Sequence, residues 1–440
     1  MLNYFSSNKH SKQINKPTSQ FFNMRIIFIT ISFLVLFLTI GKTQNQSVFP
    51  SVKAEALSDA IIADGFQNVS LYSFDSTLVI NYENRVYRFE ANAVYQLLEL
   101  IIPTIEQSFS KLVLITKRQS IPLVAWEVDI QNYQAFRQQK IGIDQLKNHI
   151  YTSNDLSYVS HGTELVANKN KGNYKIEILI KPTLKLALGG FPEPVLHQIN
   201  LQPIANLFLW KGAQLQLEGI LPLSNEIEIP EEEFARPGIL AFYQQIRLPK
   251  NFFAGLSVGY FTDKRYGVAT ELKKFFFNGN LLLKTRIGYT GHASYPRQVG
   301  MDSPVKEWEY APLNYLDYRL GIDYWLSKWN TRVGLSYGKV LHQKRVLHLE
   351  VSQQFKETEI GFFAFKTERG NNYGVQLAIP TFPKKYWKPK WISIRPTNHF
   401  SYTYHSTQNR IQDYITGIPT NENALNPSLL KNQLLSILGD

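Results

Sequence analysis

The chain of 440 residues contains no cysteine. Without thiols it cannot form disulfides, bind zinc through cysteine or use a sulfur nucleophile. Its structure must therefore depend on packing, hydrogen bonds and ion pairs alone.

Signatures of catalysis are also missing. The nine histidines are dispersed, and the chain has no HExxH, no GxSxG and no Gly-rich phosphate loop. Glu231–Glu233 is a run of adjacent carboxylates, whereas a glycosidase needs two carboxylates about 5–10 Å apart across a sugar. We interpret the run as solvated loop charge, and predict no catalytic residue, no metal ligand and no cofactor.

Long apolar runs are absent beyond residue 44, but one precedes it. Residues 26–40 read IIFITISFLVLFLTI after Arg25. This run is shorter than the roughly 20 residues of a spanning helix and suits the core of a signal peptide. We expect residues 1–43 to be a signal peptide that starts at Met24, preceded by an over-extended N-terminus; an uncleaved anchor is the alternative.

The formal net charge is +12, and residues 1–43 hold five basic residues and no acids. The rest of the chain then has 42 basic against 35 acidic residues, a net charge of +7. This excess favours an anionic partner such as an acidic glycan or a lipid headgroup, although a generic basic surface explains it equally well. No basic stripe indicates nucleic acid.

Residues 50–150 predict a small α+β module. Helices are expected over 52–63 and 91–102, the second one ending at Pro103. Short strands are expected over 69–74, 77–82, 85–89, 111–116 and 123–130. We interpret this module as periplasmic, serving either to dock or guide a substrate or as a plain spacer.

Residues 172–406 alternate with a period of two. From Leu316 to Leu326 the chain reads LDYRLGIDYWL, with leucine, isoleucine and tyrosine on one side and mostly polar residues on the other. This pattern predicts strands that have one apolar and one polar face. We predict a mainly β fold, an antiparallel outer-membrane β-barrel of about 12 strands. A soluble β-sandwich is the alternative, and the aromatic content of 13% favours contact with lipid.

The polar faces of two of these strands carry the candidate binding residues. Lys284, Arg286 and Arg319 are expected to face the lumen and contact acidic sugars, with Asp317 and Asp323 balancing their charge. On the same side, Trp325, Phe363 and Phe365 either stack on sugar rings or fill a narrow lumen.

Short turns at Ser327–Trp329 and Glu368–Asn372 are typical of the periplasmic end of a barrel. Residues 407–440 are expected to form a partly helical tail.

Three segments carry a family resemblance. KKFFFNGNLLLKTRIGYT (273–290) and FFAFKTERGNNYGVQLAIPTFPKKYW (362–387) combine strands with turns that contain adjacent Asn and Gly, and GFQNVSLYSFDSTLVINYENRVYRFEANAV (65–94) precedes the predicted barrel. They resemble the YjbH-like family of outer-membrane exopolysaccharide-biosynthesis proteins, over most of residues 50–390. The resemblance implies a barrel that takes part in the synthesis, assembly or export of a secreted polysaccharide, and it carries over no catalytic residues. The chain departs from the family in being shorter and in ending with a helical segment.

The leading hypothesis is thus a non-catalytic outer-membrane protein that assists exopolysaccharide or capsule biosynthesis, assembly or export. Its expected partners are a polysaccharide, acidic in charge, outer-membrane lipid and periplasmic export proteins. A general porin or adhesin-type surface barrel is the second hypothesis. A secreted carbohydrate-active enzyme on a β-sandwich is the third.

Overall fold

The computed structural model describes residues 50–105, 108–156, 162–188, 195–227, 232–296, 307–341, 345–368, 370–388, 390–406, 415–417 and 426–439. The expected signal peptide, its start at Met24 and the over-extended N-terminus all lie outside these residues. Among the helices that are described, none combines the length and the apolar character needed to cross a membrane.

The N-terminal module is a six-stranded sheet with helices. Its elements are α2 (Ser51–Asp64), β1 (Gln67–Phe74), β2 (Thr77–Glu83), α3 (Glu90–Ile105), β3 (Lys111–Arg118), β4 (Ile121–Asp129), α4 (Ile130–Arg137), α5 (Ile143–Leu146), the 3₁₀ turn η1 (Lys147–His149), β5 (Ile150–Ser153) and β6 (Thr163–Val166). The strand order is β5-β4-β3-β2-β1-β6, and β2 and β3 are parallel while the other pairs are antiparallel.

Two local predictions in the module are wrong. Residues 85–89 are not a strand, because the Asn84 side chain accepts hydrogen bonds from the backbone N–H groups of Val86 and Tyr87 at 3.1 and 2.8 Å. Such side-chain bonds compete with a strand ladder. Helix α3 also continues past Pro103 to Ile105, since a proline so near the end of a helix removes only one of its hydrogen bonds.

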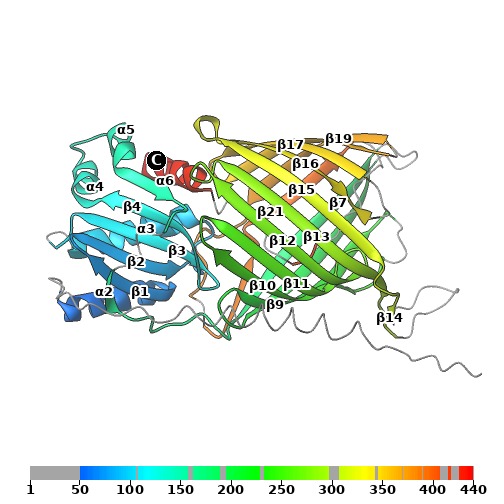
Figure 1. Ribbon diagram of the computed structural model, residues 1–440, viewed down its shortest axis with the longest axis horizontal. Coiled ribbons are helices and arrows are strands. Elements are labelled where there is room, and N and C mark those ends of the chain that lie inside the picture. The colour runs from blue at the N-terminus through cyan, green and yellow to red at the C-terminus, as the bar shows by residue number, and fades with distance from the viewer. Residues whose placement is uncertain are drawn as a thin grey trace, which may run out of the picture. The chain divides into compact units, whose positions relative to one another are not determined.

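The core of the module extends to the far end of the chain. Trp126, Leu78 and Leu97 are fully buried in it, together with the rest of the apolar face of α3. Helix α6 (Pro427–Gly439) packs on α3 and β5, and its Leu430 and Leu434 belong to the same cluster. Figure 1 shows α6, in red, beside the elements of the module. The tail thus closes onto the N-terminal module through buried leucines.

The second sheet contains fifteen strands. They are β7 (Ile176–Leu188), β8 (Val195–Phe208), β9 (Ala213–Asn225), β10 (Arg236–Leu248), β11 (Phe252–Phe261), β12 (Arg265–Phe276), β13 (Leu281–Ser294), β14 (Glu309–Tyr310), β15 (Tyr315–Leu326), β16 (Thr331–Lys339), β17 (Arg345–Phe355), β18 (Thr358–Thr367), β19 (Gly370–Pro380), β20 (Ile392–Pro396) and β21 (His399–His405). The prediction of a mainly β fold is confirmed. Along the path from β7 to β19 each strand pairs antiparallel with the next, and β14 pairs only with β13.

The two edge strands of this sheet, β20 and β21, follow each other in the chain. β20 pairs in parallel with β7, and β21 pairs antiparallel with β19, so that only Thr397 and Asn398 separate the two edge strands. β21 also lies against β7, but no hydrogen-bonded ladder joins them in the described residues. The sheet is curled (Figure 1), while its ladder is not closed, so the predicted closed barrel and its twelve strands stay a prediction.

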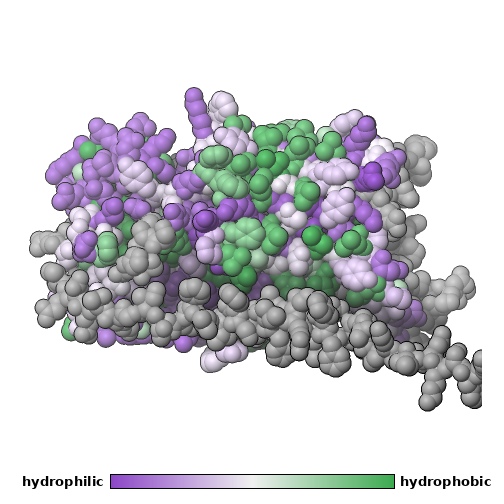
Figure 2. Space-filling view, in the orientation of Figure 1, coloured by the Kyte–Doolittle hydropathy of each residue, from purple (hydrophilic) through white to green (hydrophobic). Residues whose placement is uncertain are grey.

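The faces of the sheet have inverted polarity: in contrast to a water-soluble protein, apolar side chains are exposed and charged side chains are buried. On β15, Leu316 and Leu320 are 53% and 51% exposed, while Asp317 and Asp323 are 0% and 2% exposed. The same alternation holds on β13, β16 and β17, and Figure 2 shows apolar side chains gathered on the surface of the sheet. Because these side chains are exposed, no second layer of protein covers them in the described part of the chain, in contrast to a β-sandwich.

The two short turns expected at one end lie at opposite ends of the sheet. Ser327–Trp329 follows β15 at the end where the module is in contact, since Asn432 on α6 donates to the Ser327 carbonyl at 2.8 Å. Glu368 follows β18, which runs away from that end, because the turn before β18 holds Glu357, the ion-pair partner of Arg88 in the module. Residues 370–372 of the second expected turn are already part of β19. Of these two turns, Ser327–Trp329 alone is on the module side.

Glu90 gives the module a pH dependence. Its carboxylate, at the start of α3, accepts hydrogen bonds from Tyr82 Oη at 2.5 Å and Thr116 Oγ1 at 3.2 Å. Burial raises the pKa of Glu90 above its ordinary value, so the folded protein holds this proton more tightly than the unfolded chain does. Stability from this group is complete below the ordinary pKa and is lost as pH rises through the raised one.

We therefore expect Glu90→Gln to raise the unfolding temperature at pH 7 more than at pH 4, because glutamine stays neutral throughout. Thermal unfolding followed by tryptophan fluorescence measures the difference, with Glu55→Gln on the exposed face of α2 as the control. An equal effect of Glu90→Gln at both pH values would contradict this account.

Candidate binding site: a charged cluster on the buried face of the sheet

The five predicted binding residues lie on one face of two paired strands. Lys284 and Arg286 are on β13, and Asp317, Arg319 and Asp323 are on β15. Arg286 is directly opposite Arg319, Lys284 is opposite Gly321, and Asp317 is opposite Gly288. Directly opposed residues project to the same side of a sheet, so the structure brings all five together.

Their charged groups are paired within the cluster. Lys284 Nζ lies 2.6 Å from Asp323 Oδ2, and Arg286 Nη2 lies 3.5 Å from Asp317 Oδ2. Arg319 donates from Nε to Ser336 Oγ at 3.2 Å and lies 3.4 Å from His348 Nδ1. Both aspartates are almost completely buried. A buried carboxylate needs such partners because its desolvation is costly.

Neighbouring strands complete the cluster with residues that the prediction missed. Arg332 on β16 lies 3.7 Å from Asp323 and 3.8 Å from Glu359, and it also forms an ion pair with Glu350 on β17. On β12, Lys273 Nζ is 2.9 Å from Glu271. Each of these residues lies on the polar face of its own strand, so the alternation of apolar and polar residues could have identified them. That alternation does not, however, predict which strands are neighbours.

The cluster surrounds a cavity of about 340 Å³ lined by five cationic side chains and three carboxylates. The cations are Lys273, Lys284, Arg286, Arg319 and Arg332, and the carboxylates are Glu271, Asp323 and Glu350. Their excess of positive charge is modest, and the ion pairs already engage several of them. Such a lining favours contact with a polar or anionic ligand through charge-assisted hydrogen bonds.

The aromatic residues of the polar faces fill space instead of lining an open surface. Phe363 and Phe365 stack at an interplanar angle of 6° and are buried beside His348. Trp325 is buried in the core cluster of the module. Of the two interpretations from sequence, filling a narrow lumen agrees with the packing of Phe363 and Phe365, whereas Trp325 packs with the module.

The module contacts the end of this sheet through a second polar network. Glu83 accepts hydrogen bonds from Asn68 at 2.6 Å and from the Gln119 N–H at 2.9 Å, and it pairs with Arg85 at 2.5 Å. Arg85 also lies 3.5 Å from Glu177 on β7, which Arg395 on β20 contacts at 2.9 Å.

Single contacts reinforce this network. Arg247 on β10 donates to the Pro122 carbonyl of β4 at 2.7 Å. Lys117 lies beside this network, and burial lowers its pKa to about 8. Its ammonium group therefore loses its proton more readily than that of an exposed lysine. These contacts fix the module against the mouth of the polar interior.

The described residues show no further chemistry of catalysis or metal binding. No group of three or more His, Cys, Asp or Glu that could hold a metal occurs among them. Of the acidic run, Glu231 lies outside the described residues, and Glu232 pairs with Lys185 at 2.7 Å. That carboxylate belongs to an ion pair, and is not merely solvated as expected.

Comparison with protein families gives one match. The model of the YjbH family, described as "Exopolysaccharide biosynthesis protein YbjH", matches residues 15–233. The expected family resemblance is thereby confirmed for these residues, which include the segment 65–94. The two other segments that carried the resemblance, 273–290 and 362–387, lie beyond the match.

No curated protein matches the chain. Solved structures that are similar include the loop-deletion mutant OmpTdeltaL8 of the outer membrane protein OmpT from Vibrio cholerae, at 9% identity and a TM-score of 0.26, over 46% of this chain and 85% of that one. OccK2 (OpdF) of Pseudomonas aeruginosa has 14% identity and a TM-score of 0.25, over 46% of this chain and 59% of that one. A mutant of the Rh. blastica porin has 8% identity and a TM-score of 0.27, over 52% of this chain and 98% of that one.

The ion pairs of the cluster are testable by a double-mutant cycle. Asp323→Asn leaves Lys284 and Arg332 facing each other without their shared carboxylate, and we expect a loss of about 3 kcal/mol in stability. The double variant Lys284→Gln with Asp323→Asn should lose less than the sum of the two single variants, since the repulsion is then relieved. Thermal unfolding in detergent measures the coupling, with Lys366→Gln on the exposed side of β18 as control. Strictly additive losses would contradict the pairing.

Proposed function

We propose that residues 176–405 form a closed barrel in the outer membrane, with the N-terminal module in the periplasm, and that the protein assists the biosynthesis, assembly or export of an exopolysaccharide without catalysing bond chemistry. The inverted polarity of the sheet carries this proposal. The family match over residues 15–233 supplies the class of process.

Water is a poor solvent for the outer face. About thirty large apolar side chains on β8–β21 are exposed, and each one loses on the order of 1 kcal/mol or more by staying in water. The sum, tens of kcal/mol, is the free energy that transfer of this face from water to an apolar solvent would gain. Acyl chains remove this cost, because they solvate leucine and isoleucine as well as a protein core does.

Aromatic residues at the two ends of the strands support the same placement. Exposed aromatics near the module end include Trp210, Phe277, Trp329, Trp387 and Trp391, and those near the opposite end include Tyr289, Tyr310, Tyr337, Tyr373 and Tyr404. Two aromatic girdles that bracket an apolar band are characteristic of outer-membrane barrels.

The connections between strands favour a periplasmic module. On the module side the strands are joined by tight turns such as 249–251 and 356–357, whereas the longest connection of the opposite end runs from residue 295 to residue 314. Outer-membrane barrels have short periplasmic turns and longer outer loops. A general porin fits less well, because the module occupies the mouth of the polar interior and the charges inside are paired.

A polysaccharide partner accords with the polar interior and with the family match. Lys284, Arg286 and Arg319 would bind its acidic groups, and Asp317 and Asp323 would hold these cations in position. Periplasmic export proteins are further expected partners, which the module is suited to contact.

The barrel is tested by gel mobility before and after heating. We expect the protein to fractionate with outer membranes and to migrate differently once heated, since a closed barrel resists detergent until it unfolds. Recovery in the soluble fraction with unchanged mobility would overturn the barrel.

The role is tested by deleting the gene and measuring secreted polysaccharide and small-solute uptake. We expect polysaccharide to fall at least severalfold while solute uptake stays the same. Normal polysaccharide with altered uptake would instead favour a porin. Hydrolysis of glycan by the purified protein, abolished by a single Glu or Asp substitution, would replace the non-catalytic role with that of an enzyme.

A further inference from the structure

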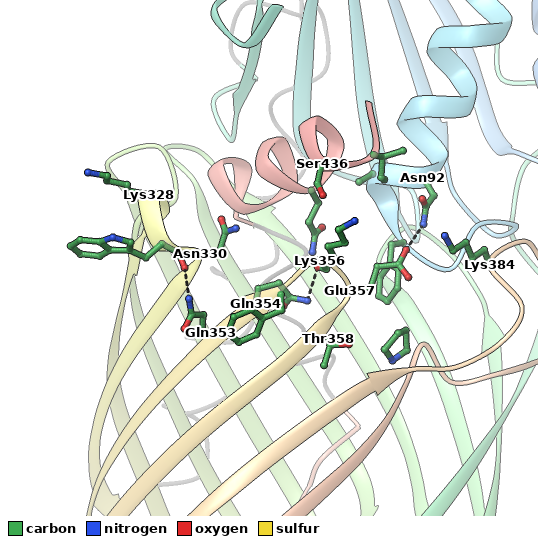
Figure 3. A pocket seen from close by; sticks show the side chains of 17 residues that line it. Asn92, Lys328, Asn330, Gln353, Gln354, Lys356, Glu357, Thr358, Lys384 and Ser436 are labelled. Carbon is green, nitrogen blue, oxygen red and sulfur yellow. Dashed lines mark hydrogen bonds between the residues drawn. The ribbon is translucent and has the colours of Figure 1, made fainter. Parts of the chain in front are cut away.

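A large cleft lies beside helix α6, apart from the charged cluster. It has a volume of about 1070 Å³ and is bounded by the start of α3, the turn after β15, the turn between β17 and β18, and one side of α6. Ligand pockets commonly measure about 300–1,000 Å³ and form where structural units meet. Figure 3 shows the side chains that line it, among them Asn92 from α3 and Ser436 from α6.

The lining combines hydrogen-bonding groups with aromatic faces. Its amides include Asn92, Asn330, Gln353, Gln354 and Gln433, which offer both donors and acceptors. Phe89, Trp329 and Phe355 also line the cleft. Amides matched to hydroxyl groups, together with flat apolar surfaces for ring faces, suit a sugar chain better than they suit a wholly apolar ligand.

The charge of the cleft is positive. Lys328, Lys356 and Lys384 line it, and the only carboxylate in the described lining is Glu357. Glu357 is already engaged by Arg88 and by Asn92, which donates to it at 3.0 Å. In the view of Figure 3 the ends of Lys356 and Lys384 lie on either side of Glu357. Among the described residues, no ion pair involves Lys328 or Lys384, so these two cations are available to an anionic ligand.

The cleft borders the polar interior. Phe89, Gln354 and Gln433 line both the cleft and a chamber under the module that also contains Glu359 and Arg395. Glu359 in turn lies 3.8 Å from Arg332 of the charged cluster. Polar side chains therefore continue from the cleft at the side, past the module, to the buried face of the sheet.

We propose that this cleft binds a segment of an anionic oligosaccharide and is the lateral entrance to the polar interior on the module side. The proposal rests on the proposed function and assigns it a docking site and a class of ligand. Lys328 and Lys384 contact the carboxylates of the sugar, the amides bind its hydroxyl groups, and the volume accommodates several linked rings. A sugar chain that enters through the cleft passes beside the module, so the module can keep its contacts with the end of the sheet.

Binding to the purified full-length protein in detergent tests the proposal, with hexagalacturonate as the acidic probe and maltohexaose as the neutral one. Calorimetry should detect binding of hexagalacturonate, weakening as salt is added because exposed charges are screened. The double variant Lys328→Gln with Lys384→Gln should bind it roughly tenfold more weakly, at a severalfold loss for each exposed ion pair. Lys390→Gln, an exposed lysine outside the lining of the cleft, is the matched control and should bind as the unaltered protein does.

Each other outcome overturns the proposal. If the unaltered protein does not bind hexagalacturonate, or binds maltohexaose equally well, the assigned ligand class is wrong. If the double variant binds hexagalacturonate as tightly as the unaltered protein does, the sugar binds elsewhere. Heat-dependent gel mobility of each variant verifies that it is folded. Membrane fractionation and the secretion of polysaccharide judge the proposed function separately, so a cleft that fails leaves those results intact.

Discussion

The organisation of this protein depends on the inverted polarity of its large sheet. Strands alternate strictly, so a single choice of face sends leucine, isoleucine and tyrosine outward and sends charged residues inward. Once the charges face inward, they lose water and must find partners. Asp323 between Lys284 and Arg332, and Asp317 beside Arg286, satisfy this demand across neighbouring strands. The same choice leaves the apolar side chains exposed on the outer face, which is the basis of the proposed contact with lipid.

The N-terminal module and the C-terminal helix act as one body at the end of this sheet. Leu430 and Leu434 of α6 are buried with the core of α3 and β4, although more than three hundred residues separate them in the chain. Arg88 and Arg247 then connect this body to strand ends on different parts of the sheet. The cleft beside α6 lies between one side of this helix and the turns that follow β15 and β17.

The sequence predicted what is periodic and missed what depends on distant pairing. The period of two placed Lys284, Arg286, Asp317, Arg319 and Asp323 on one face because that face is a local property of each strand. Arg332 and Glu350 lie on the polar side of their own strands, yet the contacts of Arg332 with Asp323 and with Glu350 arise only when β16 and β17 take their places in the ladder. The strand expected at residues 85–89 failed because the Asn84 side chain binds the backbone there. The position of helix α6 on the module likewise results from tertiary packing, which no local sequence pattern predicts.

The parallel pairing of β20 with β7 has a consequence for biogenesis. All other neighbours in the large sheet are antiparallel, and parallel pairs are slightly weaker per residue. This seam also joins the first strand of the large sheet to one of its last strands, and among the strand pairings of that sheet it spans the longest stretch of chain and has the greatest loop-closure cost. The hairpins from β7 to β19 can form one after another along the chain, whereas the pairing of β20 with β7 can form only when residues 392–396 are present. The seam is thus the natural last step of assembly and the first place at which the sheet would part.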